Sequence, residues 1–270
     1  MKTIVLTLAL LHANVYLQGQ VYVWKEFSNI HNFGSFSQHF QQASSFQDNP
    51  ACLSRQMKLT FGAWYHYAYM LNELSAFSSY LLIPGKKSGF GIAASLQGKV
   101  PWQQSNYSIS YGRLLSGEFE LGIQFHYFQL KTAGYGKDRF VMPELAILMH
   151  PTSLLSIGIS GQVPVKDKPL KYSGMRTPFV YTLGIGYELE KVALLELMLT
   201  KVGQEMVSCR FRCSYQAALQ KILFTGINTR PFNFFLGSSI RISSVSLGLM
   251  VYYHPNLGLY PNSSIAWQKL

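Results

Sequence analysis

The chain has 270 residues, of which 48% are hydrophobic, 14% are aromatic and only 13% are charged. This apolar content excludes intrinsic disorder, and the charged fraction is about half of the roughly 25% that is typical of soluble domains. No run of about 18 consecutive apolar residues occurs, so a bundle of membrane-spanning helices is excluded as well. Two classes are left, a soluble β protein with a large core and a closed β-barrel in a membrane.

The formal net charge is +11, with 23 Lys and Arg residues against 12 Asp and Glu residues. The basic residues are dispersed and form no Lys/Arg-rich stretch of the kind that binds nucleic acid, so we expect no nucleic-acid partner. Outer-membrane lipid and lipopolysaccharide carry anionic headgroups, and they are the expected partners of basic loops such as the one at Lys86 and Lys87.

The N-terminus has the layout of a secretory signal peptide. Lys2 supplies a positive charge, Thr3–Leu11 is a short apolar stretch, and a polar segment follows it. We therefore expect a signal peptide over residues 1–19 and export to the bacterial outer membrane. The chain has three cysteines, which are too few for a disulfide framework in an exported protein.

Residues 20–56 form a segment of a different character. They show little alternation and mix Phe with Gln, Ser and His, which makes the segment too aromatic for a flexible linker. A barrel built from the residues that follow would enclose a lumen too wide for wall side chains alone to fill. We therefore expect residues 20–56 to lie in this lumen as a plug.

From residue 57 to the end, apolar and polar residues alternate with period two, which is the pattern of β-strands with two different faces. The clearest strands are Glu118–Leu130, Phe179–Glu190 and Val207–Gln216. Weaker versions of the pattern occupy Met57–His66, Glu73–Ile83, Gly89–Gly98, Gln104–Leu115, Arg139–His150, Ser153–Val163, Val192–Val202, Ala218–Asn228, Pro231–Ser243, Val245–His254 and Leu259–Leu270. The total is about 14 strands, and 12–14 is the range that leaves enough residues for the connections.

Short turns alternate with longer connections along this region, as in membrane barrels. Turn-forming residues occur at Pro84–Lys87, Ser116–Gly117, His150–Thr152, Glu190–Lys191 and Ser243–Ser244, and longer connections are expected over Thr132–Asp138 and Pro164–Arg176. No stretch is long enough for a crossover helix, which argues against a parallel sheet. The expected fold is all-β, a closed antiparallel transmembrane β-barrel formed by residues 57–270.

A soluble β-sandwich or lipocalin-like barrel would show the same alternation, with its apolar faces turned inward. Two features favour the membrane barrel, whose apolar faces point outward. The second face of the strands is mostly Gly, Ser and Gln, and aromatic residues fall near strand ends as in the girdles of membrane barrels. The residues of the expected girdle are Tyr80, Tyr107, Tyr127, Tyr187, Tyr215, Tyr253 and Trp267.

No sequence motif for catalysis, metal binding or cofactor binding is present, so we expect no enzymatic activity, no cofactor and no metal. Charged side chains at membrane depth avoid lipid, so those on the strands should point into the lumen, with Glu196 opposite Arg210 or Arg212 on the next strand. Such a pair would hold the barrel or its plug, or line a path for a ligand or ion. The expected lumenal residues are Glu120, His126, Glu196, Arg210, Arg212 and Arg241.

Two short motifs carry a resemblance to known barrels. The element Asp48, Asn49, Pro50 and Ala51, just ahead of the first strand, resembles the Asn-Pro-Ala element of the long-chain fatty-acid transporter (FadL-like) family, and also that of the PorV and PorQ proteins of the Bacteroidota type IX secretion system. A second element near the C-terminus is similar to one in such Bacteroidota proteins, and it consists of His254, Pro255, Leu257 and Gly258. The chain departs from the family pattern after the first motif, where Cys52 replaces the usual Gly or Ala.

The resemblance implies two functions, and we rank a third one, from another class, after them. The first is a subunit or shuttle of a protein secretion or assembly machine, with protein partners in that complex. The second is an outer-membrane transporter that takes a small hydrophobic ligand. The third is an outer-membrane lipid-modifying enzyme, for which no serine or histidine is marked by a catalytic pattern.

Overall fold

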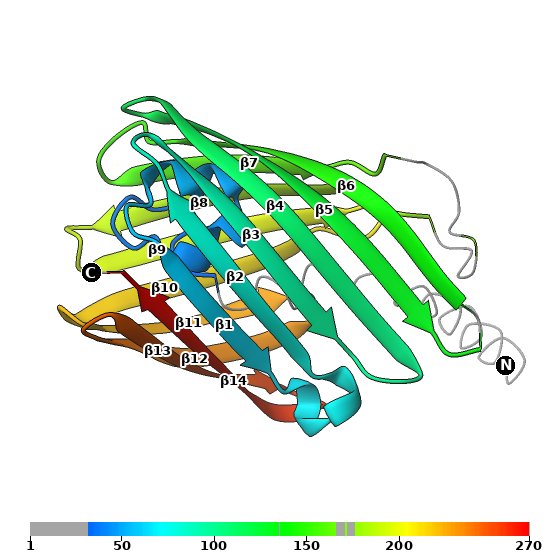
Figure 1. The fold of residues 1–270 in the computed structure, drawn as a ribbon. Coiled ribbons are helices and arrows are strands. Elements are labelled where there is room, and N and C mark those ends of the chain that lie inside the picture. Colours follow the sequence, from blue (N-terminus) through cyan, green and yellow to red (C-terminus); the bar gives the residue numbers. More distant parts are fainter. Residues whose placement is uncertain (1–31, 135, 166–170, 172–175, 270) are drawn as a thin grey trace, which may run out of the picture.

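The computed structural model describes residues 32–134, 136–165, 171 and 176–269. They form a closed barrel of fourteen antiparallel strands in which each strand pairs with the next in sequence and β1 pairs with β14 (Figure 1). The expected fold class is confirmed, with a strand number at the upper end of the expected range. The expected signal peptide and the first part of the expected plug lie outside the described residues. Within the described part of the chain, no helix is long and apolar enough to cross a membrane.

The strands follow the alternating segments of the sequence closely. They are β1 (Thr60–His66), β2 (Ala76–Pro84), β3 (Ser88–Gln97), β4 (Trp102–Ser116), β5 (Phe119–Thr132), β6 (Gly136–Met149), β7 (Leu155–Gln162), β8 (Val180–Leu189), β9 (Ala193–Val202), β10 (Ser208–Ala218), β11 (Lys221–Thr229), β12 (Phe232–Ile242), β13 (Val245–His254) and β14 (Gly258–Gln268). The long connection expected over Thr132–Asp138 is wrong, because β5 and β6 extend into it and pair as far as Thr132 and Gly136.

The apolar faces of the strands point out of the barrel. On β5, Leu121 and Phe125 are 41% and 51% exposed, whereas Glu120 and Gln124 on the alternate face are 0% and 1% exposed. A soluble β protein would turn these faces the other way, so this arrangement is that of a barrel surrounded by lipid. Tyr80 is a correction to the expected aromatic girdle, because it points into the lumen and is only 7% exposed. The other expected girdle residues are exposed on the outer surface, namely Tyr107, Tyr127, Tyr187, Tyr215, Tyr253 and Trp267.

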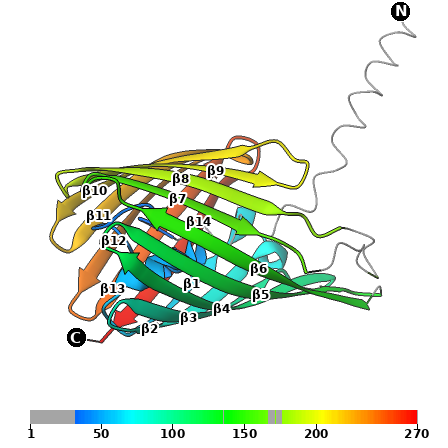
Figure 2. The same cartoon turned by 90° about the horizontal axis from the view of Figure 1, so that it is seen from above.

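The two ends of the barrel differ. One end, which we call the terminal end, carries the start of β1, the last residues of β14 and short turns such as residues 85–87 and 243–244. The opposite end, which we call the loop end, carries the longer connection with the 3-10 helices η3 (Ala68–Met70) and η4 (Asn72–Leu74). Figure 2 shows that β4, β5 and β6 extend furthest at the loop end, while the C-terminus lies at the terminal end.

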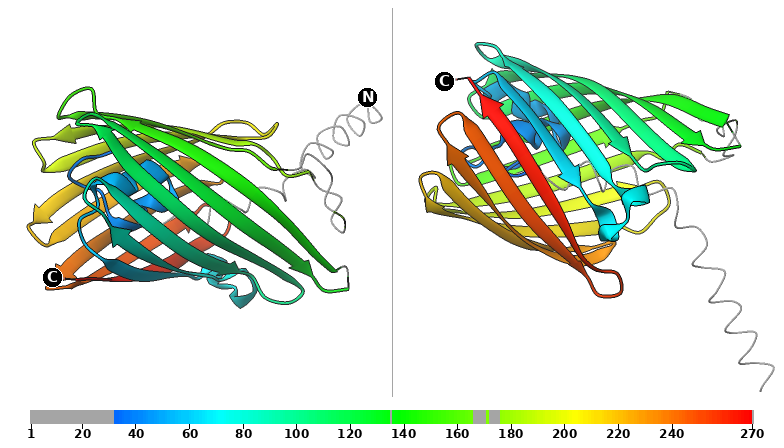
Figure 3. Two further views of the ribbon diagram at one scale, coloured as in Figure 1. Left: turned by 45° about the horizontal axis from the view of Figure 1, so that its top comes forward. Right: turned by 60° about the horizontal axis from the view of Figure 1, so that its bottom comes forward.

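Residues 32–56, which we call the inner segment, lie inside the barrel in its terminal half (Figures 1 and 3). The segment contains two short 3-10 helices, η1 (Ala43–Gln47) and η2 (Pro50–Arg55), and most of its side chains are buried. Asn49 caps η2, because its side-chain oxygen accepts a hydrogen bond from Ala51 N at 3.0 Å. The chain itself therefore occupies much of the lumen in the terminal half.

Candidate functional site: the lumen around the inner segment

Three inward-facing carboxylates hold the inner segment to one side of the barrel wall. They come from Glu120 on β5, Glu188 on β8 and Glu196 on β9, and all three are nearly or fully buried. Their strands bring them to the terminal half of the lumen because each lies at an inward position in the terminal half of its strand. A buried carboxylate requires hydrogen-bond donors, and the inner segment supplies most of them.

Glu188 is surrounded by three consecutive residues of the inner segment. Its Oε1 accepts hydrogen bonds from Ser37 Oγ at 2.9 Å and from the backbone N–H of Gln38, while its Oε2 lies 2.6 Å from His39 Nδ1. Glu188 is 1% exposed in its side chain and His39 is 38% exposed, so the carboxylate is covered by a histidine that reaches water. This contact fixes residues 37–39 against the terminal end of β8.

Glu196 binds residues of the inner segment that precede those bound by Glu188. Its carboxylate accepts hydrogen bonds from Gly34 N at 3.4 Å and from Phe36 N at 3.3 Å, and it pairs with Arg212 Nη1 at 3.4 Å. Arg212 in turn donates to the carbonyl oxygen of Asn32 at 2.5 Å. The ion pair between β9 and β10 is thus completed by the backbone of the inner segment.

Glu120 binds the last turn of the inner segment. It accepts hydrogen bonds from Ser54 Oγ at 2.6 Å and from Arg55 Nε, and it lies 2.8 Å from His150 Nε2. Arg55 also donates to the carbonyl oxygen of Gly117 in the β4–β5 turn at 2.7 Å. The segment is therefore anchored at both of its ends on the wall formed by β5, β8 and β9.

Glycines in the wall let the backbone of the inner segment approach the strands closely. A Cβ atom added at Gly122 on β5 would lie 2.2 Å from Ala51 N, and one added at Gly186 on β8 would lie 1.7 Å from the carbonyl oxygen of Phe36. Real side chains do not tolerate such distances, so only glycine fits at these two positions. The close approach buries Cys52, whose thiol contacts the carbonyl oxygen of Ser35 at 3.3 Å.

Cys52 is a free cysteine in the inner segment, not on a spanning strand. Burial raises the pKa of its thiol well above the ordinary value, and the nearby carboxylates of Glu120, Asp48 and Glu196 raise this pKa further. The thiolate is the reactive form of cysteine, so Cys52 is held in its unreactive, protonated form.

The wall on the other side of the lumen carries a different surface. Five inward side chains of β11–β14 form one buried cluster, which we call the aromatic patch, and they are Phe224, Phe235, Met250, Tyr252 and Tyr260. Phe33 of the inner segment packs against this patch, with its ring centroid 3.9 Å from that of Phe224. The guanidinium carbon of Arg212 lies 4.6 Å from the centroid of the Phe33 ring, so Phe33 also makes a cation–π contact.

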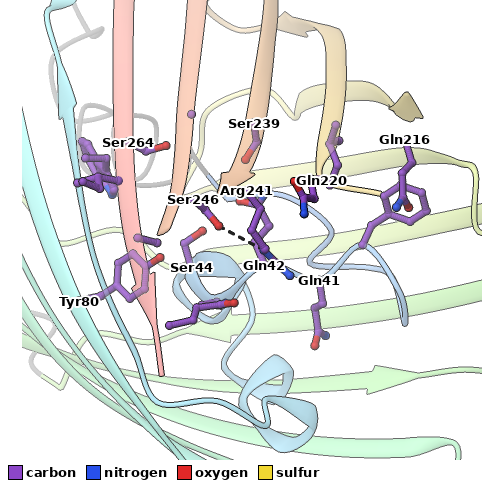
Figure 4. Close-up of a pocket in the computed structure, with 18 of the residues that line it drawn as sticks. Gln41, Gln42, Ser44, Tyr80, Gln216, Gln220, Ser239, Arg241, Ser246 and Ser264 are labelled. Carbon is purple, nitrogen blue, oxygen red and sulfur yellow. Dashed lines mark hydrogen bonds between the residues drawn. The ribbon is translucent and has the colours of Figure 1, made fainter. Parts of the chain in front are cut away.

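A cavity of about 170 Å³ lies between the inner segment and β10–β14, next to β1 and β2 (Figure 4). Its lining includes Ile222 on β11 and Gly248 on β13, which are the inward positions next to Phe224 and Met250 in the direction of the terminal end. It also includes Ser264 on β14, which lies two inward positions beyond Tyr260. The cavity and the aromatic patch therefore follow one another along the same inner wall, and Phe33 lies at the patch.

The Asp48–Ala51 motif lies inside the lumen. Asp48 accepts hydrogen bonds from Asn32 Nδ2 at 3.1 Å and Ser35 Oγ at 3.2 Å, so it closes the inner segment on itself. Asn49 caps η2 and donates through Nδ2 to the carbonyl oxygen of Ile147 at 3.4 Å. Pro50 and Ala51 pack against wall glycines. The structure thus gives the motif a role in shaping and seating the inner segment.

The expected lumenal residues all face inward, but they do not form one site. Arg212 is the partner of Glu196, whereas Arg210 donates to Asn228 Oδ1 at 2.7 Å. His126 lies 3.1 Å from Glu144 and so belongs to a separate polar group on β5 and β6. Arg241 lines the cavity.

The C-terminal motif lies at the loop end, in and around the β13–β14 turn. His254 ends β13, and its Nδ1 accepts a hydrogen bond from Asn256 N at 3.2 Å. Pro255 and Leu257 are exposed in the turn, and Gly258 begins β14 with a φ of 81°, which favours glycine. The motif therefore makes a turn, far along the barrel from the anchoring carboxylates.

Several residues that hold the site are not among those expected from the sequence. Glu188 and Glu144 lie on the polar faces of alternating strands and are recognisable only as lumen-facing carboxylates. Arg55, His39 and His150 pair with carboxylates 65, 149 and 30 residues away in sequence, and no local pattern indicates these pairings. Among the described residues, no group of three or more His, Cys, Asp or Glu side chains is arranged to hold a metal ion.

No protein-family model matches the sequence, and no curated protein matches it. Solved structures resemble the fold. The chain superposes with a TM-score of 0.62 on the toluene transporter TbuX of Ralstonia pickettii, at 10% identity, covering 89% of this chain and 99% of that one. The toluene transporter TodX of Pseudomonas putida gives 0.63 at 9% identity, covering 87% and 95%. A FadL homologue of Pseudomonas aeruginosa gives 0.61 at 11% identity, covering 87% and 96%.

These similarities show a shared fold, and they correct the functional expectation. The expected assignment to a secretion or assembly machine is wrong, because the barrels that share this fold are described as hydrocarbon channels, toluene transporters and a FadL homologue. The part of the resemblance that concerns the FadL-like barrel is confirmed at the level of the fold. The neighbours are described as channels and transporters and not as enzymes.

Proposed function

We propose that the chain is a channel for small hydrophobic molecules in the bacterial outer membrane. We also propose that an N-terminal signal peptide directs its export to that membrane. The outward apolar faces of the strands suit a lipid environment. The shared fold with barrels described as transporters of toluene and as monoaromatic hydrocarbon channels supports a hydrophobic solute. Lipid and lipopolysaccharide are its expected surroundings.

The aromatic patch carries this proposal. In the outer membrane, the inward faces of a pore for polar solutes are polar, whereas here five neighbouring inward side chains of β11–β14 are aromatic or apolar. A second apolar cluster faces the lumen from β5, β6, β8 and β9, and it consists of Phe128, Met142, Val180 and Val202. Apolar side chains on facing walls give a hydrophobic solute a favourable surface inside the barrel.

The passage runs along the β11–β14 wall. The anchoring hydrogen bonds of the inner segment go to β5, β8 and β9, on the opposite side of the lumen. On the β11–β14 side the segment contacts the wall through the ring of Phe33, and the cavity lies beyond that contact. A solute that displaces the Phe33 ring would reach the cavity without breaking the carboxylate anchors.

Uptake by Gram-negative cells tests the function, because an intact lipopolysaccharide leaflet slows hydrophobic solutes. Cells that produce the barrel should take up radiolabelled toluene several times faster than cells with an empty vector, while uptake of a labelled disaccharide stays unchanged. Equal toluene uptake in the two strains would contradict the proposal. An equal increase for the disaccharide would show a general pore instead.

A further inference from the structure

The cavity at the terminal end contains one arginine and no acidic residue. Arg241, near the end of β12, lines it, and Arg241 Nε lies 3.4 Å from Ser246 Oγ, which is a weak hydrogen bond. Within the described part of the chain, no carboxylate lies within 4.0 Å of this guanidinium. Arg212, another lumenal arginine beside the inner segment, is instead paired with Glu196. Arg241 is thus a cation directed at a cavity with nothing to neutralise it there.

The surroundings of Arg241 are rich in neutral hydrogen-bonding groups. Figure 4 shows Gln42 of the inner segment beside Arg241, and Gln220 lines the same space. The wall adds further amides and hydroxyls, which belong to Gln216, Gln268, Ser239, Ser246 and Ser264. Amide N–H and hydroxyl groups donate to an anion without adding charge, so they reinforce the single guanidinium.

One side of the cavity is aromatic. Phe40 and Trp64 line it, and Tyr80 projects into it from β2 beside Ser44. The Tyr80 ring lies flat against the wall because Gly62 on β1 leaves room for it, and Phe46 holds it edge-on at 6.0 Å between centroids. The cavity therefore combines an apolar side with a cationic, amide-rich side.

The volume of the cavity limits the size of a ligand that it can bind. A cavity of about 150 Å³ accommodates a benzene molecule. The cavity here is about 170 Å³, which suits one ring with a small polar group and not a long acyl chain. The exposed residues Leu219 and Gln220 at its rim leave it accessible from the terminal end.

From these features we infer that the cavity is a binding site for a small aromatic carboxylate, whose carboxylate is held by Arg241 and whose ring packs on the side of Phe40, Trp64 and Tyr80. Arginine is suited to this ligand because its planar guanidinium matches a carboxylate with two parallel hydrogen bonds. The site goes beyond the proposed channel, since binding from the terminal end requires no passage through the barrel.

Titration of the purified full-length barrel in detergent tests the inference, with benzoate as the probe and heat of binding as the signal. Benzamide has the same shape without the charge, and inorganic phosphate has the charge without the ring. Benzoate should bind saturably and at least tenfold more tightly than either. Arg241→Gln should weaken benzoate binding at least tenfold and leave benzamide unchanged. Arg113→Gln makes the same change on the outer face of β4 and should stay within twofold of the parent.

Several results would overturn the inference. Equal binding of benzoate and benzamide would remove the role of the charge, and phosphate binding as tight as that of benzoate would remove the role of the ring. Unchanged benzoate binding in Arg241→Gln, or no saturable binding to the parent protein at tens of millimolar, would exclude the site. Toluene uptake by cells is measured separately, so failure of this site and failure of the channel proposal are distinguishable.

Discussion

Glu188 on β8 and His39 of the inner segment meet at 2.6 Å, although they lie 149 residues apart in sequence. The same carboxylate accepts hydrogen bonds from Ser37 Oγ and from the backbone N–H of Gln38. The contact shows how the inner segment is held. A single wall residue collects the side chains and the backbone of one short turn, and the barrel fixes where that wall residue stands.

Replacing the Glu188 carboxylate should loosen the inner segment. Glu188→Gln keeps the size of the side chain but removes the charge that strengthens its hydrogen bonds, at a cost of about 2 kcal/mol. Hydrogen–deuterium exchange should become faster in residues 34–40. Glu190→Gln, two residues along in an exposed turn, is the matched control and should leave this exchange unchanged. Equal exchange in the two variants would show that Glu188 does not anchor the segment.

The glycine at position 122 should be irreplaceable for a steric reason. Gly122→Ala places a methyl group where Ala51 N lies 2.2 Å away, so η2 must shift from the wall. Melting of the inner segment should occur at a lower temperature, and Cys52 should become open to thiol reagents. Gly117→Ala is the control, because nothing lies within 4 Å of an added Cβ there. A Gly122→Ala barrel with native-like melting and with Cys52 still unlabelled, as located by peptide mapping because Cys209 and Cys213 are free as well, would contradict the close contact.

Cys52 should resist alkylation in a pH-dependent way. The pKa of its thiol is raised by burial, so at any given pH the folded protein contains less thiolate than an unfolded chain does. Because the folded state favours the protonated thiol, the stability this gives is complete below the ordinary thiol pKa and is lost as the pH rises through the folded pKa. A water-soluble maleimide should label Cys52 slowly at pH 8 and rapidly in denaturant. Rapid labelling of the folded barrel at pH 8 would show an accessible thiolate.

A charged residue on the outer face should destabilise the barrel in the middle of a strand but not in a turn. Leu236 on β12 is 66% exposed on the outer face, and Leu219 in the β10–β11 turn is 95% exposed. Leu236→Arg should destabilise the inserted barrel by about 2–4 kcal/mol, because the arginine would face lipid. Leu219→Arg should have little effect. Folding into lipid vesicles, followed by the heat-dependent shift on gels, measures both, and equal yields would argue against a lipid-facing β12.

The sequence predicts the strands well because each strand is specified locally by its own alternation. The sequence predicts less well which side chains point into the lumen where both faces of a strand are apolar. On β2, Tyr80 and Leu82 point inward while Phe77 and Ile83 are exposed, so the pattern alone gives no direction and Tyr80 is misplaced. The partner of Glu196 is within reach of prediction, since β9 and β10 are joined by a short connection and Arg212 is its register partner.

The contacts of the inner segment are beyond this kind of prediction. Residues without alternation have no register, so the sequence contains no signal that His39 meets Glu188 or that Arg55 meets Glu120. The same holds for function. The motif at Asp48–Ala51 suggested a secretion partner, but it acts inside the lumen. The Asn49 side chain caps η2, and the backbone of Pro50 and Ala51 packs on the glycines of β4 and β5.

The contact between Phe33 and Phe224 offers the most direct test of the proposed passage. Phe33→Ala removes the ring that closes the β11–β14 side, whereas Phe46→Ala removes another buried ring of the same segment, which packs toward β2 and β3. Both variants should be checked first for a folded barrel by the heat-dependent gel shift. In planar bilayers, the parent barrel and Phe46→Ala should conduct little, and Phe33→Ala should show open-channel currents and faster toluene uptake by cells. If Phe33→Ala folds and remains as closed as Phe46→Ala, the passage along this wall is contradicted.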